Sequence, residues 1–330
     1  MKTSVDTTSA DVRTGRFEYM QPSVIPSLHR NGKVLTRRDV NGSDAGSEGV
    51  DLEPVQMPVQ DARGLTGESR PTLGRNGFEL VQQPASELDF LDHKQVVSNY
   101  YPQCAEVIRN FTGASVVAAF DHNIRSAAGK RSKQKIEGGQ QVQGPAHVVH
   151  GDYTLTSAPE RLRKLAEPPL ANDTWRVDDS TPPLLDSAQV ERAITDGRFA
   201  IINVWRNIAS EPVARNPMAL CDARTVRPED LVVFEIHYAD RIGENYFARP
   251  SSGHNWYCYP AMTPDEALLI TQWDSGGELA QTNGGSADAD SDGPDSPCTF
   301  SFHTAFEDPT TPDDAPDRWS IEVRCAVLYV

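Results

Sequence analysis

Short runs of hydrophobic residues, separated by polar turns, fill most of the chain after residue 115. β-branched and aromatic residues dominate these runs, and Gly, Pro, Asn or Asp bound them, which is typical of strands. Eight runs are predicted strands: 116–120, 147–150, 199–208, 231–238, 256–259, 267–273, 300–306 and 319–330. So many short strands predict a sandwich or a double-sheet jelly roll.

Hydrophobic residues recur at helical spacing in three stretches. The longest covers 86–110, where Gly113 supplies a stop and Pro102 is expected to break the stretch into two helices. Two shorter stretches, 159–165 and 187–194, separate the earlier strands and are expected to pack on the outside of a sheet. The predicted fold class is therefore mainly β with flanking helices.

Two regions lack a clear pattern. Residues 1–74 are rich in Ser, Thr, Gly, Asp and Arg, so we expect an N-terminal extension that packs on the core or is partly flexible. Residues 77–81 then form the first predicted strand of one large domain over 75–330. Inside that domain, 275–297 holds five acids and almost no apolar residue, which predicts a solvated, mobile loop.

Composition narrows the classes of function. The 330 residues include 31 basic and 47 acidic ones, and a net charge of -16 argues against nucleic-acid or anionic-membrane partners. No apolar run approaches the length of a membrane span, and the N-terminus lacks the apolar stretch of a secretory signal, so we expect a cytoplasmic protein. The five cysteines are scattered without a C-x-x-C pair, which argues against a disulfide framework or zinc knuckle. The oligomeric state stays open.

The tripeptide His150-Gly151-Asp152 is the most informative motif. In an extended strand, residues i and i+2 point to one face, so this imidazole and this carboxylate converge above the sheet. Two histidines and one carboxylate on one face of an octahedron leave three positions open, as in non-haem Fe(II) oxygenases. A second histidine is therefore required, and His303, on the aromatic strand 300–306, is the best of eight candidates.

The last predicted strand carries a candidate anion site. One of its faces is polar at its beginning and apolar further along, with Arg318, Ser320, Glu322 and Arg324 followed by Ala326, Leu328 and Val330. Such a face suits the inside of a small barrel with a polar mouth. A guanidinium there can bind a carboxylate through two hydrogen bonds, and a serine hydroxyl adds a further donor.

The order of these motifs is more specific than any one of them: an early H-x-D, a late His and then Arg-x-Ser. The motifs are Phe120-Asp121-His122-Asn123-Ile124-Arg125, His150-Gly151-Asp152-Tyr153-Thr154, Ile202-Asn203-Val204-Trp205-Arg206, Leu220-Cys221-Asp222-Ala223-Arg224, His254-Asn255-Trp256-Tyr257, Asp265-Glu266-Ala267-Leu268, Phe302-His303-Thr304-Ala305-Phe306 and the run from Arg318 to Arg324. In them the chain resembles the iron(II)- and 2-oxoglutarate-dependent oxygenases. The resemblance is to the hydroxylase/desaturase branch, typified by the cephem 7α-methoxylase component and by fungal and bacterial tailoring oxygenases.

The resemblance implies a double-stranded β-helix with Fe(II) at its mouth. His150, Asp152 and His303 would hold the iron, which 2-oxoglutarate would chelate. The distal carboxylate of 2-oxoglutarate would meet Arg318 and Ser320, with Arg324 as the alternative. With O2, the family's reaction releases succinate and carbon dioxide and oxidises an unactivated C–H bond of a small molecule, by hydroxylation or desaturation, in secondary metabolism.

Three further residues are candidates for the substrate cavity. Asn203 and Trp205 share one face of their predicted strand, and Arg125 belongs to a polar cluster at the end of another. Gly151 departs from the resemblance, since relatives carry a larger residue there, and it is expected to loosen the backbone between two ligands.

Two alternatives stay open at this point. One is a jelly-roll protein that has lost turnover and binds a small acid through Arg318. The other keeps the iron but diverts its chemistry to ring closure, epoxidation or endoperoxide formation. Succinate release driven by substrate would separate the enzyme from the binding protein, and product mass would separate hydroxylation from desaturation.

Overall fold

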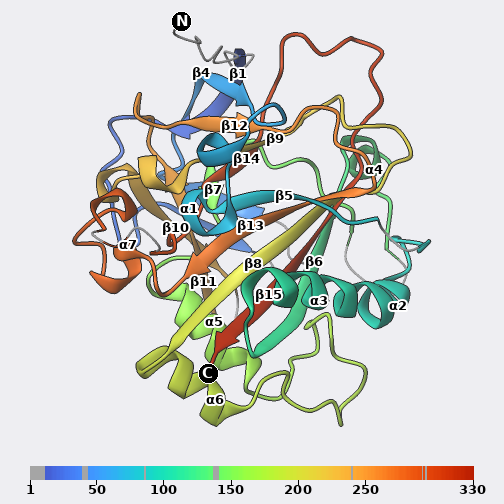
Figure 1. Ribbon diagram of the computed structural model, residues 1–330, viewed down its shortest axis with the longest axis vertical. Helices are drawn as coiled ribbons and strands as arrows, with labels where there is room; N and C mark the ends of the chain where they lie inside the picture. Colours follow the sequence, from blue (N-terminus) through green and yellow to red (C-terminus); the bar gives the residue numbers. More distant parts are fainter. Residues whose placement is uncertain are drawn as a thin grey trace, which may run out of the picture.

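The computed structural model describes residues 12–38, 44–84, 87–136, 141–238, 241–291, 293 and 296–330 (Figure 1). Some predicted features fall partly outside these ranges. They are residues 1–11 and 39–43 of the predicted extension, Ser86 at the start of the predicted helical stretch, and residues 292, 294 and 295 of the acidic loop.

The strands of the described residues form two sheets. The larger sheet has the order β1 (Val12–Met20), β4 (Leu52–Asp61), β12 (Trp256–Cys258), β9 (Met218–Cys221), β14 (His303–Ala305), β7 (His150–Gly151), β11 (Ile242–Ala248), β10 (Leu231–His237), β2 (Leu35–Arg38) and β3 (Asp44–Glu48). The smaller has the order β5 (Phe78–Gln82), β13 (Glu266–Asp274), β8 (Arg198–Asn207), β15 (Ser320–Tyr329) and β6 (Val116–Arg125), all antiparallel.

The main hydrophobic core joins the two sheets. Alternate residues of each strand point inward, so the inner faces interdigitate. Buried aromatic and aliphatic side chains of both sheets meet there, among them Phe17, Tyr19, Phe199, Ile201, Tyr246, Trp256, Phe300, Phe302 and Leu328. The predicted double-sheet jelly roll is confirmed, and every one of the eight predicted strands overlaps an observed one.

Helices cover the outer face of the smaller sheet (Figure 1). There α2 (His93–Gln95) continues through a π-helical turn, Val96–Tyr100, into α3 (Tyr101–Thr112). Pro102 stands in the first turn of α3, directly after the π-helical turn, so the chain changes its helix type beside the proline but does not leave the helical path there, as the predicted break into two separate helices required. The stretch also begins later than predicted, because residues 87–92 are not helical.

The other helices are short. Two were predicted and pack on each other, α5 (Ser157–Leu165) and α6 (Ser187–Thr195). Three were not predicted: α1 (Leu73–Asn76), α4 (Ala127–Arg131) and α7 (Glu278–Gln281). Within the described ranges, no helix has the length and apolar character that crossing a membrane requires.

The N-terminal residues belong to the larger sheet. β1 pairs with β4 and β2 pairs with β10, and Phe17 and Tyr19 are fully buried in the main core. The predicted strand 77–81 is β5, the first strand after residue 74, but four strands that were not predicted, β1 to β4, precede it in the predicted extension. A domain boundary at residue 74 stays a prediction.

The acidic loop is more ordered than its composition predicts. Leu279 of α7 and Ala287 are buried. The carboxylate of Asp288 accepts hydrogen bonds from the backbone N–H groups of Leu279 (3.2 Å) and Thr299 (2.7 Å), and from the Thr299 hydroxyl (2.8 Å). For this part of the loop the predicted solvated state is wrong, because Asp288 supplies acceptors for backbone groups that the loop leaves unpaired.

Candidate metal centre

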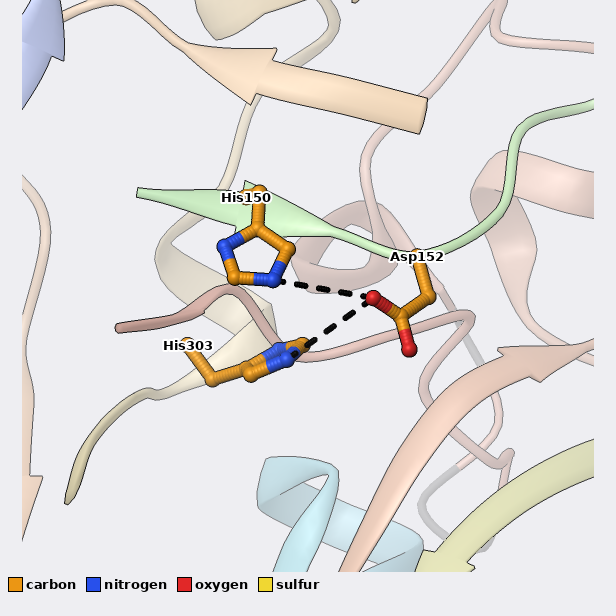
Figure 2. Close-up of side chains that lie close together, drawn as sticks. All are labelled: His150, Asp152 and His303. Atoms are coloured by element: carbon orange, nitrogen blue, oxygen red, sulfur yellow. Dashed lines mark ion pairs between the residues drawn. The ribbon is translucent and has the colours of Figure 1, made fainter. Parts of the chain in front are cut away.

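Two histidines lie side by side on neighbouring strands of the larger sheet. β14 pairs with β7 so that His303 is directly opposite His150, and their ring centroids are 4.4 Å apart. Asp152 follows the end of β7 and turns toward both rings, as Figure 2 shows. Its Oδ1 lies 3.6 Å from His150 Nε2 and 4.0 Å from His303 Nε2. One ligand atom from each residue lies within 4.8 Å of the others.

Backbone carbonyls orient the imidazole rings. Nδ1 of His150 lies 2.8 Å from the Val148 carbonyl, and Nδ1 of His303 lies 3.5 Å from the Ser301 carbonyl. A carbonyl only accepts hydrogen bonds, so Nδ1 of His150 carries the proton and its Nε2 lone pair faces Asp152. Burial, reinforced by the neighbouring His303, lowers the pKa of His150 to about 3. The ring is therefore neutral near pH 7, as a metal ligand must be.

Asp152 comes from one sheet and is held by the other. Its Oδ2 accepts hydrogen bonds from Asn203 Nδ2 on β8 (3.2 Å) and from Arg324 Nε on β15 (3.1 Å). Its backbone N–H donates to Gln272 Oε1 on β13 (3.3 Å). Burial alone would raise the pKa of this carboxyl, but Arg324 and the two histidines hold the pKa well below its usual range. Asp152 is therefore ionised at neutral pH.

The donor set fits Fe(II). Two neutral imidazole nitrogens and one carboxylate oxygen are the ligand types of the facial triad. The three side chains are largely buried, and carbonyls or side chains of a second layer orient each of them.

A narrow cavity opens beside the two histidines, and Arg125, Arg318 and Glu322 also line it. Arg318 precedes β15 and is 3 % exposed. Its guanidinium lies 5.5 Å from the Trp205 ring centroid, and its Nη1 donates to the Asn216 carbonyl. Among the described residues no carboxylate forms an ion pair with it. Burial, together with repulsion from Arg125, lowers the pKa of Arg318 to about 9.

Three buried donors near this cavity lack an acceptor within the part of the chain that the structure describes: Arg318 Nε, Ser320 Oγ and Trp205 Nε1. A buried polar group without a partner costs free energy, so such groups mark a site where something else binds. Two N–H donors and a hydroxyl beside a buried cation suit a carboxylate.

The remaining predicted site residues divide between the cavity and the metal ligands. Arg125 lines the cavity and donates to the Gly144 carbonyl (3.1 Å). Asn203 reaches Asp152 instead of the cavity. Arg324 contacts three carboxylates, those of Asp152, Asp121 (3.0 Å) and Glu322 (2.9 Å), and does not line the cavity.

Sequence reasoning missed Gln272. Its amide follows the apolar run Ala267–Ile270 in a strand that is buried along its whole length, and an amide side chain inside such a strand is a signal that could have found it.

Gly151 has a packing role between the two ligands. A Cβ at this position would lie 2.9 Å from two ring carbons of Phe300, closer than packed carbon atoms approach each other. The ring therefore occupies the space of a side chain. The predicted loosening of the backbone at Gly151 stays a prediction.

Comparisons with known proteins identify the family of the chain. The chain matches, over residues 18–328, the family model described as oxidoreductase/YMDC permease-like domain. An uncharacterised protein in the dcmA 3′ region of Methylophilus leisingeri is 44% identical over 194 residues, which cover 58% of this chain and 88% of the relative. The hydroxylase/desaturase efuI of Hormonema carpetanum is 26% identical over 308 residues, which cover 88% of this chain and 89% of the relative.

A third relative is known from both sequence and structure. The Fe(II)/2-oxoglutarate-dependent dioxygenase nvfI of Aspergillus novofumigatus is 30% identical over 263 residues, which cover 78% of this chain and 77% of the relative. The solved iron and alpha-ketoglutarate-dependent endoperoxidase NvfI superposes with a TM-score of 0.69, at 23% identity, over 96% of this chain and 98% of that one. The chain therefore belongs to the oxidoreductase/YMDC permease-like family and to the Fe(II)/2-oxoglutarate-dependent dioxygenases.

Proposed function

We propose that His150, Asp152 and His303 hold Fe(II), and that Arg318 with Ser320 binds the distal carboxylate of 2-oxoglutarate. The chain then oxidises an unactivated C–H bond of a small molecule, by hydroxylation or desaturation, and releases succinate and carbon dioxide. One observation carries the proposal: two histidines and a carboxylate converge beside one cavity, and buried donors without acceptors in the described residues lie next to the same cavity.

The protein's contribution is to hold the reactants and to exclude water. Iron with 2-oxoglutarate and O2 supplies the oxidising chemistry when bound. Nε2 of His150 and Oδ1 of Asp152 keep their lone pairs toward the metal position, because Nδ1 and Oδ2 are engaged elsewhere. Arg318 supplies a positive charge at a buried position, where attraction to a carboxylate is stronger than in water.

Charges around the cavity favour a dianionic co-substrate. The formal charges of the side chains cancel, since there are three arginines and three carboxylates: Arg125, Arg318, Arg324, Asp121, Asp152 and Glu322. A bound divalent metal would then add two positive charges, which the two carboxylates of 2-oxoglutarate would offset. Arg125 and Arg318 both face the cavity, and Arg324 is already surrounded by carboxylates. This favours Arg318 over Arg324 as the anchor. Arg125, which lines the cavity, and Trp205, whose ring lies beside Arg318, are proposed to contact the substrate.

A second outcome for the same site is endoperoxide formation, because the structural relative NvfI is an endoperoxidase. Product mass separates the outcomes: hydroxylation adds one oxygen atom, desaturation removes two hydrogen atoms, and an endoperoxide adds two oxygen atoms. A cytoplasmic location, a place in secondary metabolism and the lack of nucleic-acid and membrane partners stay predictions.

The test is release of succinate from 2-oxoglutarate by the purified chain with Fe(II) in air. We expect succinate in the wild type and background levels in each of His150→Ala, Asp152→Ala and His303→Ala, because each change removes a ligand of the metal. Arg206→Lys, at a buried arginine that contacts Tyr100 on the other side of the smaller sheet, is the control that should retain turnover. Retained turnover in any one ligand variant would contradict the assignment.

A further inference from the structure

Arg324 lies where the two sheets come closest to the metal ligands. On β15 it is opposite Asp121 of β6 and Asn203 of β8, and its side chain is 11 % exposed. Each of its three nitrogens contacts a carboxylate: Nε and Nη2 lie 3.1 Å from Asp152 Oδ2, Nη1 lies 3.0 Å from Asp121 Oδ2, and Nη2 lies 2.9 Å from Glu322 Oε1. The guanidinium is thus committed to protein groups.

These contacts divide the two oxygens of Asp152. Oδ2 receives Arg324 from β15 and Asn203 Nδ2 from β8, so donors from two strands fix it. Oδ1 is the oxygen that faces Nε2 of His150 and His303. A carboxylate held in this way presents one oxygen to a metal, at a fixed angle.

Arg318 differs from Arg324 in this respect. Its Nε has no acceptor within the described ranges, and it lines the cavity. Arg324 lies on the last strand and Arg318 on the residues that lead into it, at positions that share one face. Sequence position alone therefore does not show which of the two binds a ligand. Their surroundings do, since one is available to a ligand and the other is paired with three carboxylates.

We propose that Arg324 is a positioning residue of the metal centre: it locks Oδ2 of Asp152 so that this carboxylate binds the metal through Oδ1 alone. The inference rests on the proposed metal site and assigns Arg324 no contact with 2-oxoglutarate. Its effect is expected on metal affinity, because outer-shell partners of metal ligands typically change that affinity by about 10- to 100-fold.

Lysine is an informative replacement. Arg324→Lys keeps the positive charge among Asp121, Asp152 and Glu322, so it does not leave three neighbouring carboxylates, two of them buried, without a cation. A lysine ammonium lacks the planar fork that contacts all three carboxylates together. The change therefore tests geometry more than charge.

The experiment is a titration of metal-free protein with Mn(II) under anaerobic conditions, with free Mn(II) measured by electron paramagnetic resonance. We expect the Kd for Mn(II) to rise about 10- to 100-fold in Arg324→Lys. Arg206→Lys, which shortens another buried arginine of the same sheet, should stay within about two-fold of the wild type. Binding of 2-oxoglutarate to each metal-saturated protein, by calorimetry, should change less than Mn(II) binding in Arg324→Lys.

A second variant covers the case in which Arg324→Lys does not fold. Arg324→Gln combined with Asp121→Asn removes one charge of each sign, and it is compared with Asp121→Asn alone. The double variant should again lose about ten-fold or more in Mn(II) affinity relative to that single variant.

The outcomes separate the two proposals. Equal Mn(II) affinity in the wild type and Arg324→Lys, or a larger loss of 2-oxoglutarate affinity than of Mn(II) affinity, would overturn the role of Arg324 and leave the metal site in place. Failure of the wild type to bind Mn(II) would overturn the metal site itself.

Discussion

The two sheets bring different chemistry to the cavity between them. The larger sheet supplies His150 and His303, and burial keeps the ring of His150 neutral. The smaller sheet supplies charge: Arg125 on β6 and Glu322 and Arg324 on β15. Asp152 joins the two, since it follows a strand of the larger sheet and is bound by side chains of the smaller. The metal centre therefore depends on how the sheets pack, and each sheet can be tested separately.

The largest effect on ligand binding is expected at Arg318, which precedes β15 of the smaller sheet. Arg318→Ala removes the buried cation beside the donors that lack acceptors, so the affinity for 2-oxoglutarate should fall by about 2–3 kcal/mol, roughly 30- to 150-fold. Mn(II) affinity should stay near the wild-type value, because Arg318 contacts none of the three ligands. Calorimetry on the metal-loaded protein measures the first quantity. If Arg318→Ala left 2-oxoglutarate binding unchanged while Arg324→Ala weakened it, the two arginines would have the opposite roles.

A smaller effect is expected where the core meets the ligands. Gly151→Ala places a Cβ against Phe300, whose ring packs on Trp273 and Tyr246 and has little room to move. The free energy of unfolding should fall by about 1–3 kcal/mol, measured by urea denaturation. Gly64→Ala is the matched control, because a Cβ there meets open space. Equal stability of the two variants would show that the Phe300 ring can move to accommodate a Cβ at residue 151. The positions of the metal ligands would then not depend on this contact.

The last prediction concerns the pH dependence of stability, at the outer face of the smaller sheet. His122 follows Asp121 on β6 but points to the opposite side, where its Nδ1 lies 2.8 Å from the Tyr101 hydroxyl. Burial, reinforced by His93, lowers the pKa of His122 to about 4. The unfolded chain binds this proton near pH 6.5 and the folded chain only near pH 4. Stability from this residue is therefore complete above pH 6.5 and is lost as the pH falls toward 4, by about 3 kcal/mol.

The measurement is the urea midpoint between pH 7.5 and pH 4.5. His122→Gln should lose stability less steeply than the wild type over this range, because it removes the titrating ring. The neighbouring carboxylates titrate in both proteins, so the difference between the two slopes isolates His122. Parallel slopes would contradict a buried neutral imidazole at this position.

The sequence predicted the strands of the main body well, because alternation of polar and apolar residues reports directly on burial of one face. It missed β1 to β4, whose apolar pieces are short and separated by polar residues, although Phe17 and Tyr19 show the two-residue spacing of a strand. It also missed β9 and β11. The burial of those segments depends on partners far away in the chain, which local pattern does not report.

The site residues were named from the sequence, but the sequence did not show which group each arginine contacts. The H-x-D motif and the late histidine are local signals. Arg318 and Arg324 could not be told apart, because both lie on one polar face. Their separation depends on Asp121 and Asp152 arriving beside Arg324 from other strands, and on the turn after Gly151. These are tertiary facts, set by packing of the two sheets.

The most direct test of the account is the anaerobic absorption spectrum of the protein with Fe(II) and 2-oxoglutarate. A metal-to-ligand charge-transfer band in the visible range should appear only when both are present. It should be absent in His303→Ala, and Arg318→Ala should need a higher 2-oxoglutarate concentration to develop it. Persistence of the band in His303→Ala, or its absence in a wild type that binds both Fe(II) and 2-oxoglutarate, would contradict a metal centre built from one sheet and a co-substrate anchor built from the other.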